Sequence, residues 1–202
     1  MQRQIGCPLP PFEVDVFQLS LLLLSLLSAS WPAAGPPVPD RWHAWPVTRV
    51  FPYAVTGTSP SGATVTYLLA GVAPETSCAA AFQSALPACV TALRATYADS
   101  TATFVATVGI AVLARPIPPG TAGPVPRPAA VRPVAFPGGP AERFGERQCF
   151  TGALLASHAP YVIATAAGYA DGRSYHPGDQ AMSRLGGFAR QLAAALHRGL
   201  TG

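Results

Sequence analysis

Residues 90–114 read VTALRATYADSTATFVATVGIAVLA, and this stretch decides the fold. Its two halves, residues 90–97 and 102–113, are rich in β-branched and aromatic side chains and contain no proline. Such runs are typical of strands, and the ADST sequence between them has the composition of a turn. The sequence therefore predicts a β-hairpin at the centre of the fold.

The segments on both sides of this hairpin predict a layered α+β domain. Proline and glycine mark the breaks between elements, and an apolar period of about 3.6 residues predicts the last helix. From residue 63 the order is βαββαβ, the ferredoxin-like split βαβ pattern. We expect a mainly antiparallel sheet with helices on one face, plus an N-terminal strand and a C-terminal helix. The expected strands are residues 47–55, 63–72, 90–97, 102–113 and 159–169, and the expected helices are residues 77–86, 140–155 and 179–196.

A proline-rich insertion interrupts the domain at residues 115–140, where nine of the residues are proline. Proline has no backbone N–H and fixes φ, so this composition favours extended or polyproline geometry. We expect a stiff, solvated loop with a short strand at residues 131–136.

An apolar run, VFQLSLLLLSLLSAS at residues 16–30, precedes the domain. Its length falls short of the roughly 20 residues that span a bilayer, and its last three residues have the small-x-small pattern of a signal-peptidase site. We expect residues 1–40 to be a signal peptide or membrane anchor with a Pro/Ala/Gly linker, and residues 41–202 to be an extracytoplasmic domain. A cleaved signal, an uncleaved anchor that contacts the membrane, and a buried core helix remain open alternatives.

Charge and cysteine content narrow the classes of partner and cofactor. Only 11% of the 202 residues are charged, and the net charge of +4 comes from 13 arginines and no lysine. Because these arginines form no basic run or stripe, we expect no nucleic-acid partner. No CxxC pair occurs, and no histidine stands at metal-ligand spacing from a cysteine pair, so we expect no zinc and no other cofactor.

The cysteine spacing bears on a disulfide, which an extracytoplasmic location permits. If residues 77–86 are helical, Cys78 and Cys89 lie roughly 15 Å apart at about 1.5 Å per residue. A disulfide needs Cα atoms within about 7 Å. A second, antiparallel helix brings Cys149 towards Cys78, so we favour a bond between Cys78 and Cys149. A bond between Cys78 and Cys89 is the alternative if the first helix is shorter, and free thiols also remain open.

The densest polar cluster lies in the loop before the closing helix. A solvated connection explains such a loop, although loops of this kind also build sites. A hydrolase interpretation uses Ser174 or Ser157, His176 and Asp179, but triads are recognised by geometry and not by proximity in sequence. We assign no catalytic, cofactor-binding or metal-binding residue. The cluster consists of Asp171, Arg173, Ser174, His176 and Asp179.

The tripeptide Tyr-Ala-Asp occurs twice, at residues 97–99 and 169–171, each time at the end of an expected strand. In a ferredoxin-like sheet these two strands run in opposite directions, so we expect Asp99 and Asp171 at opposite ends. The repeat is interpreted as a turn signal and not as a carboxylate pair for acid–base chemistry.

Four segments of the domain carry a resemblance to other proteins: LAGVAPETSC (69–78), LRATYADSTATFVATVG (93–109), VAFPGGPAERFG (134–145) and YVIATAAGYADGR (161–173). They resemble a group of uncharacterised exported or membrane-anchored single-domain proteins of high-GC Gram-positive bacteria. The resemblance spans residues 41–173 and implies a leader followed by an extracytoplasmic domain. It implies no activity, so no functional residue is carried over from it. Glu13 and Asp15 depart from the Arg-rich start expected in that group.

Three functional hypotheses follow from these features. The first is a non-catalytic extracytoplasmic binding or sensing module at the cell envelope, with an envelope protein as a partner. The second is a secreted hydrolase that uses the polar loop at residues 171–179. The third is an accessory subunit of a membrane complex, held by the leader and the C-terminal helix.

Overall fold

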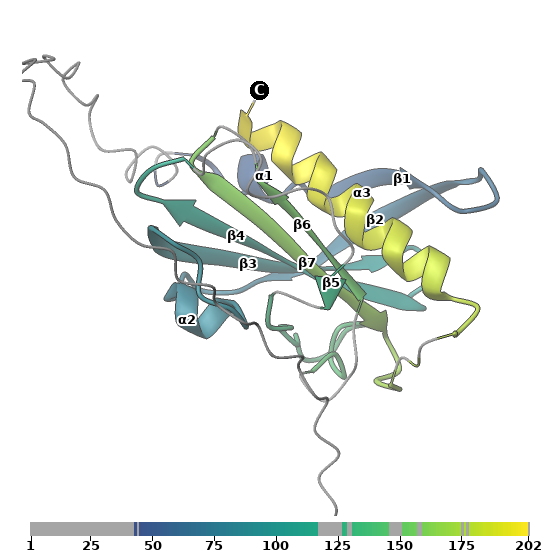
Figure 1. Cartoon of the computed structure of the whole chain (residues 1–202). Helices are drawn as coiled ribbons and strands as arrows, with labels where there is room; N and C mark the ends of the chain where they lie inside the picture. The colour runs from purple at the N-terminus through teal and green to yellow at the C-terminus, as the bar shows by residue number, and fades with distance from the viewer. Residues whose placement is uncertain are drawn as a thin grey trace, which may run out of the picture. The chain divides into compact units, whose positions relative to one another are not determined.

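A computed structural model describes residues 43, 45–116, 127–128, 131–145, 151–156, 159–174, 176 and 178–201. Together they form an α+β domain in which an antiparallel sheet carries a long C-terminal helix (Figure 1). The predicted leader, its linker and the membrane contact lie outside the described residues. Within the described ranges, no helix is long and apolar enough to cross a membrane.

The sheet has seven strands in the order β1-β2-β3-β4-β7-β6-β5, and every neighbouring pair is antiparallel. Three helices accompany the strands in the described part of the chain. The strands are β1 (Ala54–Thr58), β2 (Thr64–Val72), β3 (Cys89–Asp99), β4 (Phe104–Leu113), β5 (Arg127–Pro128), β6 (Thr151–Ala156) and β7 (Tyr161–Tyr169). The helices are α1 (Val47–Val50), α2 (Cys78–Ala81) and α3 (Met182–Thr201).

The central hairpin is confirmed. Strands β3 and β4 pair in antiparallel register, with Leu93 opposite Ile110 and Ala98 opposite Val105. Every residue of β4 is buried, because β3 and β7 flank it and both faces of the sheet are covered. A strand buried on both faces is a continuous apolar run and not an alternating one, which is the pattern of residues 104–113.

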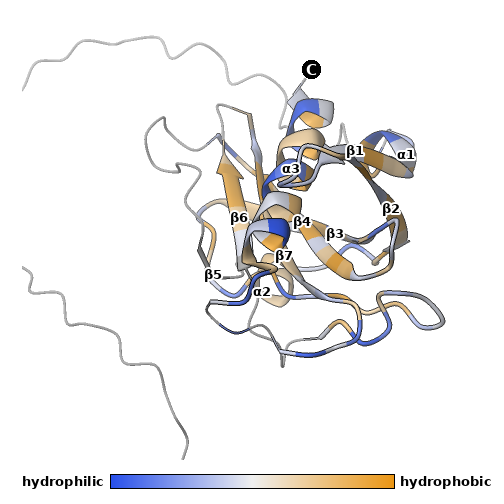
Figure 2. Cartoon of the chain, turned by 90° about the vertical axis from the view of Figure 1, so that its right-hand side faces the viewer, coloured by the Kyte–Doolittle hydropathy of each residue, from blue (hydrophilic) through white to orange (hydrophobic). Residues whose placement is uncertain are grey.

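Helix α3 covers one face of the sheet and confirms the predicted closing helix. Its buried side chains, including Leu185, Leu192 and Leu196, share a core cluster with alternate residues of β3, β4 and β7. Figure 2 shows the apolar side of the sheet curling around this helix, with β6 and the β1–β2 hairpin on its two sides. At the β2 edge, the Tyr67 ring stacks on Phe188 at a centroid distance of 4.1 Å.

The opposite face is covered by α2 and by residues 131–144, which form a second core cluster. Val131 is fully buried against the sheet. The Thr107 hydroxyl accepts the Val134 N–H at 3.0 Å, and the Thr96 hydroxyl donates to the Val134 carbonyl at 2.7 Å. The expected solvated loop is therefore wrong for this part of the proline-rich insertion, which lies across the sheet as an extended segment.

The ferredoxin-like topology is wrong. A βαβ unit joins two parallel strands through a crossover helix, whereas β2 and β3 are antiparallel neighbours. The helix expected at residues 77–86 is a single turn, α2, and Phe82 already bridges to Val131. A single turn is too short to carry the chain across the sheet, so β3 returns directly beside β2. Helices also lie on both faces, since α2 and α3 belong to opposite core clusters.

Two further elements differ from expectation. Residues 151–155 of the helix expected at 140–155 belong to β6, which pairs with β7 along six residues. This pairing supplies backbone hydrogen bonds in place of those of a helix, and Gly145 and Gly152 weaken a helix in this region. The strand expected at residues 47–55 is a helical turn, α1, followed by β1, which begins at Ala54.

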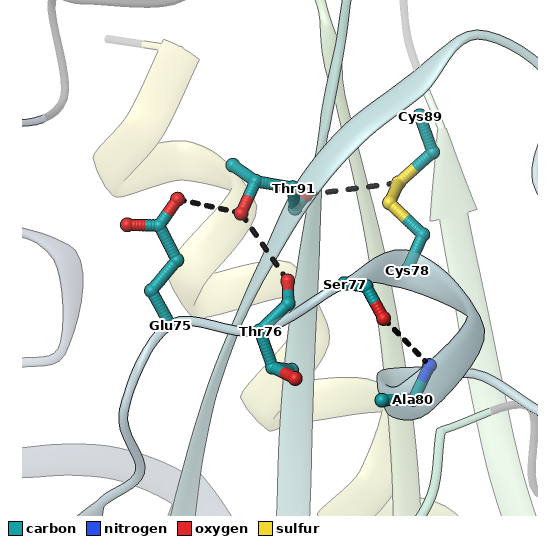
Figure 3. The surroundings of a disulfide bond; sticks show 7 residues. All are labelled: Glu75, Thr76, Ser77, Cys78, Ala80, Cys89 and Thr91. Carbon is teal, nitrogen blue, oxygen red and sulfur yellow. Dashed lines mark hydrogen bonds between the residues drawn. A yellow bond between two sulfur atoms is a disulfide. The ribbon is translucent and has the colours of Figure 1, made fainter.

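The disulfide joins Cys78 to Cys89, with Cα atoms 6.2 Å apart (Figure 3). The favoured pairing of Cys78 with Cys149 is therefore wrong, and the alternative pairing is the one present. The reason is the shortness of α2, because the chain turns back after Ala81 and returns beside its start. Ser77 caps α2, with its hydroxyl accepting the Ala80 N–H at 3.3 Å. Cys149 lies outside the described residues.

Candidate functional site

Several turns meet at one end of the sheet. Strands β3 and β7 both run antiparallel to β4, so they run in the same direction and terminate at the same end of the sheet. The expectation that Asp99 and Asp171 lie at opposite ends is therefore wrong. The β1–β2 turn also lies here, since Tyr67 near the start of β2 pairs with Asp99. This end of the sheet is the candidate site.

The Asp99 side chain organises the β3–β4 turn. Its carboxylate accepts the backbone N–H groups of Thr103 and Phe104, each at 2.8 Å, and the hydroxyl of Thr101. Ala102 follows with φ +53°, a left-handed conformation that needs local support. The interpretation of Asp99 as a turn residue is thus confirmed, although the residue is only 8% exposed and also faces a cavity.

That cavity has a volume of about 250 Å³ and lies between the β1–β2 turn, the β3–β4 turn and the start of α3. Its floor is apolar and aromatic, formed by Tyr67, Phe104 and Phe188, all nearly buried. Its walls carry many hydroxyl groups beside the apolar side chains of Pro60, Ala63 and Val65. The wall residues include Thr58, Ser59, Ser61, Thr64, Asp99, Ser100, Thr101 and Arg184.

The hydroxyl groups of Ser59, Ser61 and Thr101 in the wall already form hydrogen bonds within the turns. The Ser59 hydroxyl accepts the Ala63 N–H at 3.1 Å and lies 2.9 Å from the Ser61 hydroxyl. The Thr101 hydroxyl donates to Asp99. These bonds hold the walls in place without a ligand, so the cavity is preformed, as ligand sites usually are.

Helix α3 contributes one face to the site. Arg184, Phe188 and Gln191 are spaced i, i+4 and i+7, which places them on one side of a helix. Arg184 is exposed at the cavity, and among the described residues no carboxylate lies within ion-pair distance of it. Gln191 accepts the Thr58 N–H at 2.6 Å and donates to the Thr58 carbonyl at 2.7 Å. Its amide therefore fixes the helix to the end of β1.

The Tyr67 hydroxyl in the floor is kept neutral chiefly by its burial. Burial, and then the neighbouring Asp99 carboxylate, raise the pKa of the Tyr67 hydroxyl above its ordinary value. The hydroxyl therefore remains protonated and neutral through the physiological range. The cavity thus has one negative group on its inner wall, one positive group at its opening and an uncharged aromatic floor.

The predicted polar cluster lies at the same end of the sheet, and its contacts hold the loop that connects β7 to α3. Arg173 stacks on the Tyr169 ring at 3.9 Å and lies 3.7 Å from the Asp171 carboxylate. Asp179 accepts the Tyr169 hydroxyl and the His176 backbone N–H, each at 3.2 Å. Arg173, Ser174, His176 and Asp179 border an open hollow of about 590 Å³, which Asp171 does not line.

Within the described residues, no hydrogen bond links Ser174, the His176 ring and Asp179 into a catalytic series. Ser157 lies outside those residues. In the same described ranges, no group of three or more His, Cys, Asp or Glu side chains is placed to hold a metal ion.

The sequence did not identify Tyr67 and Arg184 as site residues. Arg184 stands beside the apolar stripe of the closing helix, where arginine usually belongs to a solvated face. The usable signal was the pairing of Arg184 with Phe188 four residues later, which places a cation beside an aromatic ring on one helix face. The pairing of Tyr67 with Asp99 depends on the β2–β3 register, which the sequence does not show.

Scans against protein-family models, curated proteins and solved structures find no match to this chain. The functional argument therefore rests on the geometry of the site.

Proposed function

We propose that this protein is a non-catalytic extracytoplasmic binding module of the cell envelope, and that its ligand site is the cavity at the end of the sheet. The observation that carries the proposal is the preformed cavity itself, with its aromatic floor, its hydroxyl walls and an exposed arginine. Concave, mostly preformed sites with an apolar floor and a few placed polar groups are typical of small-molecule binding.

The hydrogen bonds of the cavity favour binding over catalysis. The Asp99 carboxylate accepts three hydrogen bonds within its own turn, so its role in the structure is to hold that turn. A serine nucleophile needs an adjacent base, and Ser59 is instead bonded to the Ala63 N–H and the Ser61 hydroxyl.

The disulfide between Cys78 and Cys89 supports the location. Disulfides persist in oxidising compartments and are rare in the bacterial cytosol. The apolar run at residues 16–30 supplies the matching expectation of a signal peptide or anchor. Fractionation of cells that express a tagged protein, followed by sequencing of the mature N-terminus, tests this part. A full-length, cytosolic protein with reduced thiols would contradict it.

The binding site itself is tested by titrating the oxidised protein with a panel of small amino acids, sugars and organic acids while recording amide NMR shifts. We expect at least one class to shift amides of Ser61, Ser100 and Thr101 together. Ala63→Trp, at an exposed cavity position, should abolish those shifts. Leu68→Trp, on the opposite face of β2 from Tyr67, is the matched control and should retain them. A panel without any cavity shift would overturn the proposed site.

A further inference from the structure

We propose that the cavity binds a small zwitterion with an apolar tail, the chemistry of a free α-amino acid with an aliphatic side chain. The inference rests on the proposed function and names the ligand class for the same site. It is drawn from three features of the cavity: the two opposite charges that line it, its volume and the nature of its floor.

The negative partner is Asp99. An ionised carboxylate has about four acceptor positions, and the hydrogen bonds that Asp99 accepts from described residues occupy three of them. Its Oδ1 atom accepts two backbone N–H groups and its Oδ2 atom accepts only the Thr101 hydroxyl. One acceptor position on Oδ2 therefore remains for a donor that enters the cavity. A charged donor such as an ammonium group forms a hydrogen bond to a carboxylate that is roughly twice as strong as the bond from a neutral donor.

The positive partner is Arg184, which borders the same cavity from the first turn of α3. The planar guanidinium presents five N–H donors in a geometry that matches a carboxylate. In the described part of the chain no carboxylate lies within ion-pair distance of this side chain. It is therefore available to a ligand carboxylate at the opening.

The combination of charges selects the ligand class. A simple anion meets Arg184 but also faces Asp99, and a simple cation meets Asp99 but faces Arg184. Like charges placed together in a site cost binding free energy. A ligand that carries both charged groups on one carbon atom satisfies both side chains and leaves neither Asp99 nor Arg184 without its counterpart.

Size and floor select the tail. A cavity of about 250 Å³ is below the roughly 300–1,000 Å³ of drug-sized sites, so the ligand is small. Tyr67, stacked on Phe188, and Phe104 present carbon atoms to its base. An aliphatic side chain gains burial there, whereas a polar tail loses its hydration against the rings.

The test is calorimetric titration of the oxidised protein with L-leucine, L-leucinol and N-acetyl-L-leucine, with D-glucose as an uncharged polyol. L-Leucinol lacks the carboxylate and N-acetyl-L-leucine lacks the ammonium. We expect L-leucine to bind, and each analogue that lacks a charge to bind about tenfold or more weakly, the loss expected for one charge-assisted hydrogen bond. Amide NMR shifts at Ser100 and Arg184 place the bound molecule.

Two variants test the contributions of Arg184 and Asp99 to binding one at a time. Arg184→Gln should weaken L-leucine about tenfold and leave L-leucinol binding unchanged. Arg190→Gln, which removes an exposed arginine of α3 outside the cavity, is the control and should leave both unchanged. Asp99→Asn keeps an acceptor for the turn and should remove the preference for L-leucine over N-acetyl-L-leucine, with thermal unfolding recorded to confirm that it folds.

The outcomes distinguish this inference from the proposed function. Equal binding of L-leucine and both analogues, or binding of D-glucose instead, would overturn the zwitterion inference while the binding module stands. If no compound of the wider panel shifts the cavity amides, both the inference and the proposed function fail.

Discussion

At the scale of single residues, the tyrosine hydroxyls determine how this domain responds to base. Tyr97 is fully buried and its hydroxyl donates to the Pro52 carbonyl at 2.9 Å. Burial raises the pKa of Tyr97 well above its ordinary value of 10.0. The folded state then binds more protons than the unfolded state once the unfolded tyrosine ionises, so stability declines as pH rises past about 10.

We predict that the free energy of unfolding of the natural chain falls above pH 10 and that Tyr97→Phe makes this fall shallower. Below pH 9 the variant is less stable, because it loses the hydrogen bond to Pro52 at a cost of about 1 kcal/mol. Urea unfolding between pH 8 and pH 11 measures both effects. Parallel curves for the two proteins across that range would refute the prediction.

The Gln191 amide forms hydrogen bonds with the backbone at the end of β1, as a neighbouring strand would. Its two hydrogen bonds to Thr58 match those of a paired β residue, and a Cβ at Gly57 would lie 2.2 Å from its Oε1 atom. We predict that Gln191→Ala lowers the free energy of unfolding by about 1 kcal/mol, since the bonds are exposed to water. Gln180→Ala, in the exposed loop before α3, serves as the control. Equal losses of unfolding free energy in the two variants would show that the hydrogen bonds between Gln191 and Thr58 do not stabilise the domain.

At the scale of elements, the docked segment at residues 131–136 depends on a glycine in β4. A Cβ at Gly109 would lie 2.5 Å from the Val131 side chain and 3.0 Å from the Phe82 ring. We predict that Gly109→Ala costs about 1–3 kcal/mol by overpacking this contact. Gly139→Ala meets nothing within 4 Å and should change stability little. Denaturant midpoints measure both, and a neutral Gly109→Ala would show that the segment moves aside freely.

Elements were predictable from the sequence where local pattern and packing agree. Residues 104–113 have a continuous apolar run because β4 is buried on both faces, and α3 has a clean apolar stripe because one side packs on the sheet. The helix expected at 140–155 failed because Leu154 and Leu155 stand next to each other, which suits a strand between two layers as well as a helix face. Only the pairing with β7 decides that case, and this pairing is not local.

The site was less accessible from the sequence than the fold. Asp99 was recognised as a turn residue, and the turn is what it builds, but its place in a cavity follows from the parallel direction of β3 and β7. The sequence predicts opposite directions for these two strands because it predicts a crossover helix at residues 77–86, whereas α2 is a single turn. The local signal at Arg184 is limited to Phe188 four residues later on the same helix face.

At the scale of the whole domain, the disulfide closes a loop with a sequence separation of 11 residues. A crosslink over a loop of this length stabilises by about 2–3 kcal/mol, mainly by restricting the unfolded chain. We predict that the double variant Cys78→Ala/Cys89→Ala has a free energy of unfolding lower by that amount, and therefore a lower denaturant midpoint. Reduction of the natural chain should reproduce the loss, whereas a reductant-insensitive midpoint would argue against this pairing.

The way in which residues 131–136 are attached has a kinetic consequence. In the described ranges, their hydrogen bonds to β3 and β4 run through the side chains of Arg94, Thr96 and Thr107, and none of them is a rung of the sheet ladder. Residues 131–136 can therefore detach from the sheet while β3 and β4 stay paired. Deuterium should enter the Val134 amide through such partial opening, well before it reaches the amides of β4, which exchange only when the sheet itself comes apart.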